Sequence, residues 1–447
     1  MDYNHDNHIY FYGGVHPNES KSLSASEPIK QAPPIDKYTV IVNQNIGAPP
    51  KITVKKGDLV KKGQKIAEPS GFVSVPLHAP TSGTVSSITE IIGIFGTLVP
   101  AIEIIPDGKD EWCELQKMDW EKETPEKLLA KIAESGLVGM GGAAFPTAVK
   151  LSPPKTKKID TLVINGAECE PYLTADHRLM IESPEAVLRG TAIFAKILGV
   201  KNCIIGVEAN KPEAVESLKK AGAKKYGIEV RTLRVRYPQG AEKQLIYAVT
   251  GRKVPTGGLP MDVGCVVQNV GSAVAASDAV SEGKPLIERV TTITGSKVEK
   301  PGNWRLKLGT PISKALEFCG GTKEGVAKIV SGGPMMGLAQ TSIETTIMKN
   351  SSGILVLGKE DVAQYKNQPC IRCGKCVDVC PMELMPGPLS LYLENERFDL
   401  AENSFVMDCM ECGSCAYVCP SKRPLVQHFK RAKAEITAMR KSQAAKK

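Results

Sequence analysis

The sequence predicts a multidomain protein of the α/β plus β class, made of several folded units rather than one. Three observations lead to this prediction. The 447 residues are enough for about three or four domains of ordinary size. Short β-rich runs separated by glycine turns fill residues 36–106, whereas helical and β-rich runs alternate over residues 121–285. A cysteine-rich motif then occurs twice within residues 362–430.

Residues 1–35 are polar and contain several prolines, so we expect an extended arm here and not a folded domain. They lack the basic segment and apolar run of a secretory signal peptide, which favours a cytoplasmic protein with reduced thiols. The best apolar run, from Ile91 to Ile102, is shorter than the roughly 20 residues that span a bilayer. It predicts a core pair of strands around a glycine turn and no transmembrane segment.

Residues 36–106 are expected to form a barrel-sandwich hybrid domain of short strands. Their two halves, V-K-K-G-D-x-V-x-x-G-Q-x-I and A-P-x-x-G-x-V, resemble the hammerhead of biotinyl and lipoyl carrier domains. A carrier has a modified lysine at the hairpin tip between the halves. Here the tip reads EPSGFVSVPLHAP and contains no lysine. The unit is therefore predicted to be a docking or scaffold module and not a swinging arm.

Residues 121–285 alternate between amphipathic helices and β-rich runs. A helix is predicted at TPEKLLAKIAESG, and strands are predicted at TLVING, NCIIGVE and IEVRTLRV with helices between them. Crossovers of this length imply a parallel, Rossmann-like sheet with helices on its faces. Residues 286–358 are expected to form a smaller α+β unit that is compatible with a β-grasp.

The positive charge of the chain is concentrated near its C-terminus. From Lys422 to the end there are nine lysines and arginines and one acidic residue, a net +8 out of the chain's +9. The basic tail, residues 431–447, is either a solvated helix or a segment that lies on an anionic membrane face or an acidic partner. Nucleic acid is not expected, because no aromatic-interleaved basic patch or binding motif accompanies the charge.

The motif repeated within residues 362–430 is C-x2-C-x2-C-x3-C-P, which begins at Cys370 and again at Cys409. With this spacing bacterial-type ferredoxins hold two [4Fe–4S] clusters, and the last cysteine of each motif ligates the other cluster. Zinc sites also use C-x2-C pairs, but zinc does not call for three cysteines per loop followed by C-P. We therefore assign Cys370, Cys373, Cys376 and Cys419 to cluster 1, and Cys409, Cys412, Cys415 and Cys380 to cluster 2.

Three segments of the α/β region predict a flavin or nucleotide pocket. Residues 136–147, GLVGMGGAAFPT, form a glycine-rich loop whose N–H groups can approach a phosphate closely. Residues 165–178 follow a predicted strand, so their polar side chains lie where open α/β sheets bind ligands. A charged surface loop is the alternative interpretation of this second segment. The third segment, RYPQGAEKQL at residues 236–245, precedes a further asparagine at position 269.

Together these segments resemble the NADH-binding flavoprotein subunit of respiratory complex I, where they form one pocket for FMN and NADH. The order of flavin, β-grasp (SLBB-like) and iron–sulfur domains is similar as well. The resemblance implies that FMN is held by Gly139, Gly141, Gly142, Lys150, Asn165, Glu168, Tyr237, Gly240 and Asn269. It also implies contacts with NAD(H) from Phe145, Glu170 and Glu242, with Phe145 stacking on the nicotinamide. Charged residues of that family are replaced here by Met140, Ala167 and Ala241.

Nearly the whole chain resembles the C subunits of Rnf complexes, which are membrane-bound ferredoxin:NAD oxidoreductases. The N-terminal GGVHPNESK, the lysine-less hammerhead, the glycine loop and the paired cysteine motifs carry this resemblance. It implies a peripheral subunit on the cytoplasmic face of the membrane, within an ion-translocating complex. An iron–sulfur partner subunit would receive electrons from ferredoxin. Hydride would pass between NAD(H) and FMN, and single electrons between FMN and the two clusters, since a flavin exchanges both.

Two alternatives stay open on the sequence. Cobalamin reductases of bacterial microcompartments share the flavin and cluster modules in another arrangement and pass electrons to a different acceptor. A non-enzymatic relay with two clusters and docking domains would bind no flavin and oxidise no NADH. The presence of Phe145 and Glu170 in the flavin motifs favours the enzyme over the relay.

Overall fold

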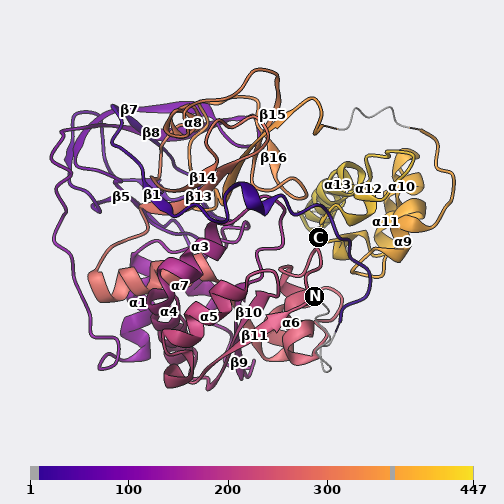
Figure 1. Cartoon of the computed structure of the whole chain (residues 1–447), viewed down its shortest axis with the longest axis horizontal. Coiled ribbons are helices and arrows are strands. Elements are labelled where there is room, and N and C mark those ends of the chain that lie inside the picture. Colours follow the sequence, from indigo (N-terminus) through magenta and orange to yellow (C-terminus); the bar gives the residue numbers. More distant parts are fainter. Residues whose placement is uncertain (1–9, 363–367, 446–447) are drawn as a thin grey trace.

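The computed structural model describes residues 10–362 and 368–445. The α/β unit fills the lower part of the molecule, the β-rich units lie above it, and the cysteine-rich helical unit lies at the right (Figure 1). Predictions that fall on residues 1–9, 363–367 and 446–447 lie outside the described residues.

The barrel-sandwich unit consists of two small antiparallel sheets around one apolar core. One sheet has the strand order β2-β8-β7-β4, and the other has the order β3-β5-β6. Side chains such as Val40, Ile66 and Ile102 are buried in this core, because successive side chains of a strand point to opposite faces. The strands are β2 (Tyr38–Ile41), β3 (Lys51–Ile52), β4 (Leu59–Val60), β5 (Lys65–Glu68), β6 (Leu77–His78), β7 (Gly83–Ile92) and β8 (Leu98–Pro106).

The long apolar run forms the end of the β7–β8 hairpin, so the predicted strand pair is confirmed. The prediction that the whole run lies in the core is wrong, because the tip of the hairpin is exposed. Phe95 is 73% exposed and Leu98 is 65% exposed. The reason is that burial along β7 is confined to the half that begins at Gly83, where Val85 enters the core, and the remaining half projects beyond it.

The segment between the two hammerhead halves is pinned against the α/β unit. Val75 packs into the main core of that unit. The ammonium of Lys349, which is fully buried, donates to the carbonyl oxygens of Pro76 at 3.0 Å and Gly136 at 2.7 Å. Burial lowers the pKa of Lys349 to about 7. These contacts immobilise a segment that a carrier domain needs to keep free.

The α/β unit is a parallel sheet of four strands with helices on both faces. Its strand order is β11-β10-β9-β12, and all neighbouring strands are parallel. Leu162 and Ile164 face one apolar cluster and Val163 faces another, as expected for strands that are buried on both sides. The strands are β9 (Thr161–Gly166), β10 (Asn202–Glu208), β11 (Ile228–Leu233) and β12 (Cys265–Asn269). The helices are α1 (Pro125–Glu134), α2 (Thr147–Lys150), α3 (Ala175–Glu182), α4 (Pro184–Leu198), α5 (Pro212–Lys220), α6 (Glu242–Thr250) and α7 (Val270–Ser277).

Helices α4 and α7 pack closely because a glycine lies at their contact. A Cβ atom at Gly190 would overlap the carbonyl oxygen of Ala273. Helix α4 begins with Pro184 in its first turn and ends at Gly199, whose φ of 67° gives the left-handed cap that glycine favours. This packing holds the N-terminus of α7 directly beyond the end of β12.

The third unit is a six-stranded sheet with the order β1-β14-β13-β17-β15-β16. Its central strand β13 is antiparallel to β14 and parallel to β17, which fits the β-grasp-like unit expected from the sequence. The N-terminal arm, which we expected to be irregular, adds β1 to the free edge of β14. The elements are β1 (Ile29–Gln31), β13 (Glu288–Thr294), β14 (Gly302–Lys307), α8 (Ile312–Phe318), β15 (Val326–Ser331), β16 (Leu338–Ala339) and β17 (Gly353–Gly358).

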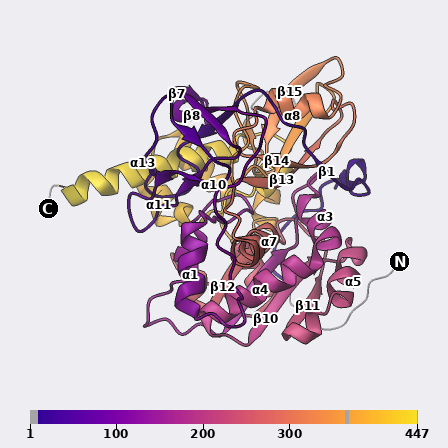
Figure 2. The same ribbon diagram turned by 90° about the vertical axis from the view of Figure 1, so that its left-hand side faces the viewer.

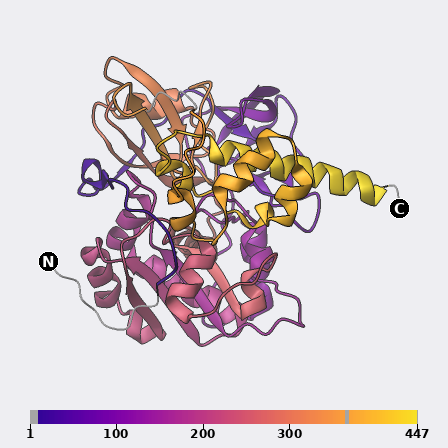
Figure 3. The same cartoon turned by 90° about the vertical axis from the view of Figure 1, so that its right-hand side faces the viewer.

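The cysteine-rich unit is helical, and its last helix runs through the predicted start of the basic tail at residue 431. Phe429 and Ile436 of that helix are buried in the core of the unit. Its C-terminal part projects from the body of the molecule (Figures 2 and 3). Across the described residues, no helix is long and apolar enough to cross a membrane. The helices are α9 (Lys375–Asp378), α10 (Pro386–Glu394), α11 (Phe398–Asn403), α12 (Ser414–Tyr417) and α13 (Leu425–Ala445).

Candidate functional site

The parallel sheet has one position where the strand order changes direction, and it lies between β9 and β12. The chain proceeds outward from β9 to β10 and β11 and then returns to the other side of β9 as β12. Open α/β sheets bind ligands beyond the carboxyl ends of the strands at such a position. Asn165 in β9 and Asn269 in β12 are register partners there. Two of the predicted flavin contacts are thus adjacent in the crevice that the topology creates.

The glycine-rich loop lies over the same crevice. Met140 donates its backbone N–H to the hydroxyl of Ser272 in α7 at 3.0 Å, and a Cβ atom at Gly141 would lie 3.5 Å from Nδ2 of Asn269. Gly139 closes the loop by donating to the carbonyl of Phe145 at 2.8 Å. Gly142 has a φ of +130°, and a Cβ atom at this position would meet open space. The loop therefore presents an exposed backbone that a phosphate can approach closely.

Asn165 joins the loop after β9 to the loop before α6. Its Nδ2 donates to the carbonyl of Gly240 at 2.7 Å, and its Oδ1 accepts from the N–H of Ala167 at 3.1 Å. A Cβ atom at Gly240 would lie 3.2 Å from Sγ of Cys169, which accepts a hydrogen bond from the Gly240 N–H. Glycine at position 240 thus allows the two loops to approach each other.

Glu168 and Asn269 use their side chains to hold helix ends at the crevice. The Glu168 carboxylate accepts from the N–H groups of Asp176 at 2.8 Å and His177 at 3.0 Å, at the start of α3. Asn269 accepts from the N–H of Gly271 at 2.8 Å and donates to the Asp176 carboxyl at 2.6 Å. Burial, together with the nearby Glu168 charge, raises the pKa of Asp176 to about 7. Both predicted flavin contacts are therefore also structural parts of the crevice wall.

Glu170 lies where three units meet. Its carboxylate accepts hydrogen bonds from the N–H groups of Met335 at 3.1 Å and Met336 at 2.9 Å, in the loop between β15 and β16. The Tyr237 hydroxyl lies 3.4 Å from it and donates to the carbonyl of Cys412 at 2.7 Å. Burial raises the pKa of Glu170 to about 7. Tyr237 thus connects the flavin crevice directly to the backbone of a predicted cluster ligand.

Two further predicted contacts form an ion pair with each other. Lys150 at the end of α2 lies 2.7 Å from the Glu242 carboxylate at the start of α6. Both side chains are partly exposed. The predicted residues of the α/β unit therefore fall into linked groups around one crevice, contributed by the glycine loop, the ends of β9 and β12, and the segment that precedes α6.

The cysteines predicted for cluster 2 surround a common cavity, although they come from both motifs. The cavity is lined by Cys380, Cys409, Cys412 and Cys415 among other residues. Backbone N–H groups approach the sulfurs, with Leu384 donating to Cys380 and Glu411 to Cys409, each at 3.4 Å. Four soft sulfur donors with N–H groups directed at them fit a [4Fe–4S] cluster.

The cysteines predicted for cluster 1 lie on the outer side of the same unit. The pKa of the Cys376 thiol is raised mainly by its burial and further by the neighbouring Cys419 and Cys370. Cys373 is exposed. Cys419 thus lies near Cys376 of the first motif, and Cys380 lines a cavity with Cys409, Cys412 and Cys415 of the second. The crossed ligation of the two clusters stays a prediction.

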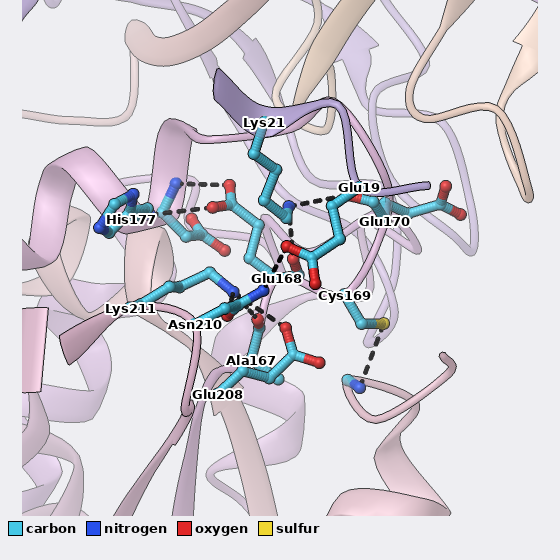
Figure 4. Close-up of polar contacts among 12 residues, drawn as sticks. Glu19, Lys21, Ala167, Glu168, Cys169, Glu170, His177, Glu208, Asn210 and Lys211 are labelled. Atoms are coloured by element: carbon cyan, nitrogen blue, oxygen red, sulfur yellow. Dashed lines mark hydrogen bonds and ion pairs between the residues drawn. The ribbon is translucent and has the colours of Figure 1, made fainter. Parts of the chain in front are cut away.

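Two buried lysines that the sequence did not single out hold the backbone of the loop after β9 (Figure 4). Lys21 of the N-terminal arm donates to the carbonyls of Glu168, Glu170 and Leu173. Lys211 donates to the carbonyl of Ala167 at 2.8 Å and is paired with the Glu208 carboxylate. No local pattern in the sequence signals these contacts, because Lys21 is 147 residues from Glu168.

Known domain families match each unit of the chain. The Nuo51 FMN-binding domain matches residues 132–278, and the RnfC barrel sandwich hybrid domain matches residues 9–109. The SLBB domain matches residues 290–339, and the 4Fe–4S dicluster domain matches residues 363–420. Together with the crevice and the crossed cysteines, these matches define an electron-transfer flavoprotein with FMN and two [4Fe–4S] clusters.

Relatives over the full length define the family. The chain is 50% identical to the C subunit of the proton-translocating ferredoxin:NAD(+) oxidoreductase complex of Clostridium ljungdahlii, over 98% of this chain and 96% of that protein. It is 44% identical to the C subunit of the Na(+)-translocating ferredoxin:NAD(+) oxidoreductase complex of Acetobacterium woodii, over 97% of this chain and 98% of that protein. The chain belongs to the family of C subunits of these oxidoreductase complexes.

A solved structure has a related fold. An NAD+-reducing [NiFe]-hydrogenase in the H2-reduced state aligns with 73% of this chain and 67% of its own, with a TM-score of 0.50 and 19% identity. This likeness supports the arrangement of the fold alone.

Proposed function

We propose that this chain is the peripheral subunit of a membrane-bound, ion-translocating oxidoreductase that exchanges electrons between NAD(H) and ferredoxin. Bound FMN supplies the exchange of hydride with a nicotinamide and of single electrons with iron–sulfur clusters. The observation that carries the proposal is the contact at Tyr237, which borders the flavin crevice and donates to the carbonyl of Cys412, a ligand of cluster 2. A flavin in the crevice is thereby a neighbour of a one-electron carrier.

The residues around the crevice have separate roles in this proposal. The exposed backbone of the glycine loop and Lys150 receive the FMN phosphate, and the side chains at the strand ends orient the flavin ring. The FMN contacts are Gly139, Gly141, Gly142, Lys150, Asn165, Glu168, Tyr237, Gly240 and Asn269. Phe145 stacks against the nicotinamide, and Glu170 and Glu242 contact the rest of NAD(H). No side chain needs to act as a general acid or base.

The positions of the two clusters support an order of electron transfer. The predicted ligands of cluster 2 lie next to the α/β unit, since Gln244 of α6 donates to the carbonyl of Pro381 at 2.9 Å, beside Cys380. Cluster 1 lies beside exposed Cys373 and Ile371, which is 66% exposed. Cluster 2 is therefore the inner carrier next to FMN. Cluster 1 faces an iron–sulfur partner subunit, on the cytoplasmic face of the membrane, that receives electrons from ferredoxin.

Binding of FMN to substituted proteins tests the flavin site. Asn165→Ala removes the hydrogen bond to Gly240 that joins the two loops at the crevice and the hydrogen bond from Ala167 within the first loop. We expect the Kd for FMN to rise at least about tenfold. The control is Asn202→Ala. Asn202 is the first residue of β10 and lies at the amino end of the strands, away from the crevice at their carboxyl ends. A wild-type chain that binds no FMN, or equal FMN binding by the two variants, contradicts the proposed site.

A further inference from the structure

The N-terminal arm contacts the cysteine-rich unit, the segment that precedes α6 and the loop that follows β9. Gly14 donates its N–H to the carbonyl of Val379, next to the cluster ligand Cys380, at 2.8 Å. Val15 exchanges two backbone hydrogen bonds with Tyr237, at 2.8 and 2.9 Å. A Cβ atom at Gly13 would lie 2.8 Å from the carbonyl carbon of Cys380. The arm therefore lies against both the cluster unit and the segment that precedes α6.

Further along, the arm is joined to the loop that follows β9. The carbonyl of Glu19 accepts from the N–H of Tyr172 at 2.7 Å, and the hydroxyls of Ser24 and Thr174 lie 2.8 Å apart. Lys21 lies between these two anchors in the sequence and is only 8% exposed. The long aliphatic stem carries its ammonium group into the interior of the loop (Figure 4).

Three carbonyl oxygens of the loop converge on this ammonium group. Lys21 Nζ donates to Glu168 and Glu170 at 2.9 Å each and to Leu173 at 2.6 Å. An ammonium group has three donors, so its hydrogen-bonding capacity is fully used by backbone. Burial lowers the pKa of Lys21, while the nearby charge of Glu168 raises it. The Lys21 ammonium group therefore fixes the backbone of this loop and, among the described residues, does not form an ion pair with one particular carboxylate.

The loop needs such a fixing group because its conformation is sparsely populated. Glu168 has a φ of +44° and Tyr172 a φ of +70°, which are left-handed conformations that residues with a Cβ atom rarely adopt. The same conformation directs the Glu168 carboxylate to the start of α3 and the Glu170 carboxylate to Met335 and Met336. Conformations of this kind persist only where the surroundings over-determine them.

We propose that Lys21 is a positioning residue of the flavin site, which reaches in from the N-terminal arm and holds the loop of residues 165–174 in its FMN-binding conformation. The inference rests on the proposed function, because it takes this loop to be one wall of the flavin pocket. Lys211, which holds Ala167, belongs to the α/β unit itself. Lys21 by contrast makes flavin binding depend on a segment outside that unit.

The test compares Lys21→Met with Lys30→Met in the full-length chain carrying both clusters. Methionine keeps the apolar stem but leaves three buried carbonyls without their donor. Lys30 is a matched control, since it lies in the same arm and pairs with Glu27 at the surface. We expect Lys21→Met to raise the Kd for FMN at least tenfold and to speed hydrogen exchange of the amides of Tyr172, Asp176 and His177. Lys30→Met is expected to leave both unchanged.

Iron content and circular dichroism establish that each variant is folded. If Lys21→Met does not fold, Ser24→Ala takes its place, because it removes the anchor at Thr174 without removing the buried cation. That variant is expected to raise the Kd a few-fold and to speed the same exchange. Unchanged exchange in folded Lys21→Met overturns the positioning role of Lys21, and unchanged exchange in Ser24→Ala overturns the dependence of the loop on the arm, whether or not FMN binds. A wild-type chain that binds no FMN refutes the proposed function instead, so the two failures are distinguishable.

Discussion

Glu170 is buried at the meeting point of three units, and it accepts hydrogen bonds from the backbone amides of Met335 and Met336, while the Tyr237 hydroxyl lies 3.4 Å away. A Cβ atom at Gly333 would overlap its carboxylate, so glycine is needed at that position of the neighbouring loop. The residue predicted to contact NAD(H) is therefore held by a loop that lies 165 residues further along the chain. Because Glu170 is buried, its protonation state affects the stability of the fold.

The pH dependence of stability is expected to change in Glu170→Gln. Burial raises the pKa of Glu170 to about 7 from its usual 4.5. The stabilising contribution of the protonated carboxyl is complete below pH 4.5 and is lost as the pH rises through 7. At about 1.4 kcal/mol per pKa unit, the loss is on the order of 3 kcal/mol. Thermal unfolding between about pH 5 and about pH 8 is expected to show a smaller decline for the variant.

A matched substitution controls for the loss of one negative charge. Glu216 is exposed and pairs with Lys220 at the surface, so Glu216→Gln is expected to retain the wild-type pH dependence. An equally steep decline in Glu170→Gln and in the wild type would refute the raised pKa of this carboxyl.

Individual site residues were predictable from the sequence only where they stand in a local pattern. Asn165 lies at the end of a predicted β-rich run, which indicates that it lies at the carboxyl edge of a parallel sheet, whereas Asn269 was assigned only through the family resemblance. Lys21 belongs to no such pattern, because its three partners are backbone carbonyls of a loop about 150 residues away. The backbone N–H groups that bind the Glu170 carboxylate could not be predicted either, because they too lie far away along the chain.

At the scale of secondary-structure elements, the two cysteine motifs and their helices α9 and α12 form one interlocked pair. In the predicted ligation, each motif supplies three ligands to one cluster and its last cysteine to the other. A substitution in one motif is therefore expected to affect the cluster that is bound mainly by the second.

Cys380→Ser tests this crossed ligation. Although Cys380 belongs to the first motif, it lines the cavity of Cys409, Cys412 and Cys415. We expect Cys380→Ser and Cys412→Ser to remove the same cluster signal from the EPR spectrum of the dithionite-reduced protein. Cys373→Ser is expected to remove the other signal. Loss of the Cys373 signal in Cys380→Ser would show that each motif binds its own cluster.

The contact of α4 with α7 gives a second prediction at this scale. In Gly190→Ala the new methyl group would overlap the carbonyl oxygen of Ala273, so the helices must separate. Overpacking of this kind costs about 1–3 kcal/mol, and it also displaces the N-terminus of α7 at the flavin crevice. We expect a lower Tm and weaker FMN binding. Gly71→Ala, where a Cβ atom meets open space, is the control and is expected to change neither.

The elements themselves were largely predictable where the sequence has long runs of one type. Strands β9, β10 and β11 were predicted because they are fully apolar runs between amphipathic helices. Strand β1 was not, since its three residues IKQ carry no alternation and acquire strand structure only by pairing with β14.

For the whole molecule, the arrangement of units explains which surfaces remain available to partners. The predicted ligands of cluster 2 lie against the α/β unit and the arm, since Gln244 donates to the carbonyl of Pro381 and Gly14 to the carbonyl of Val379. Cys373 of predicted cluster 1 is exposed, and the end of α13 projects from the body of the molecule (Figure 3). Among the described residues after Ser421, Arg423, Arg431, Lys433 and Arg440 form ion pairs with acidic residues of the same unit. Three of these four belong to the predicted basic tail, so part of the tail is engaged with its own unit.

Truncation of α13 tests whether its end attaches the subunit to the membrane complex. Among the described side chains of α13, Ile436 is the last that is buried. Removal of residues 438–447 is therefore expected to leave both clusters in place, whereas a cut after Lys430 would strip Ala432 and Ile436 from the core. We expect the shorter cut to reduce recovery of the chain with membranes that contain the complex. Full recovery would show that the tail has no docking role.

The central claim is that a flavin joins the nicotinamide to the two clusters, and an anaerobic titration of the reconstituted protein with NADH tests it most directly. Visible absorbance follows the flavin, and EPR follows the clusters. We predict that NADH bleaches the flavin band and that reduced-cluster signals appear only when FMN is bound. Clusters that dithionite reduces but NADH does not, in protein that carries FMN, would contradict the claim.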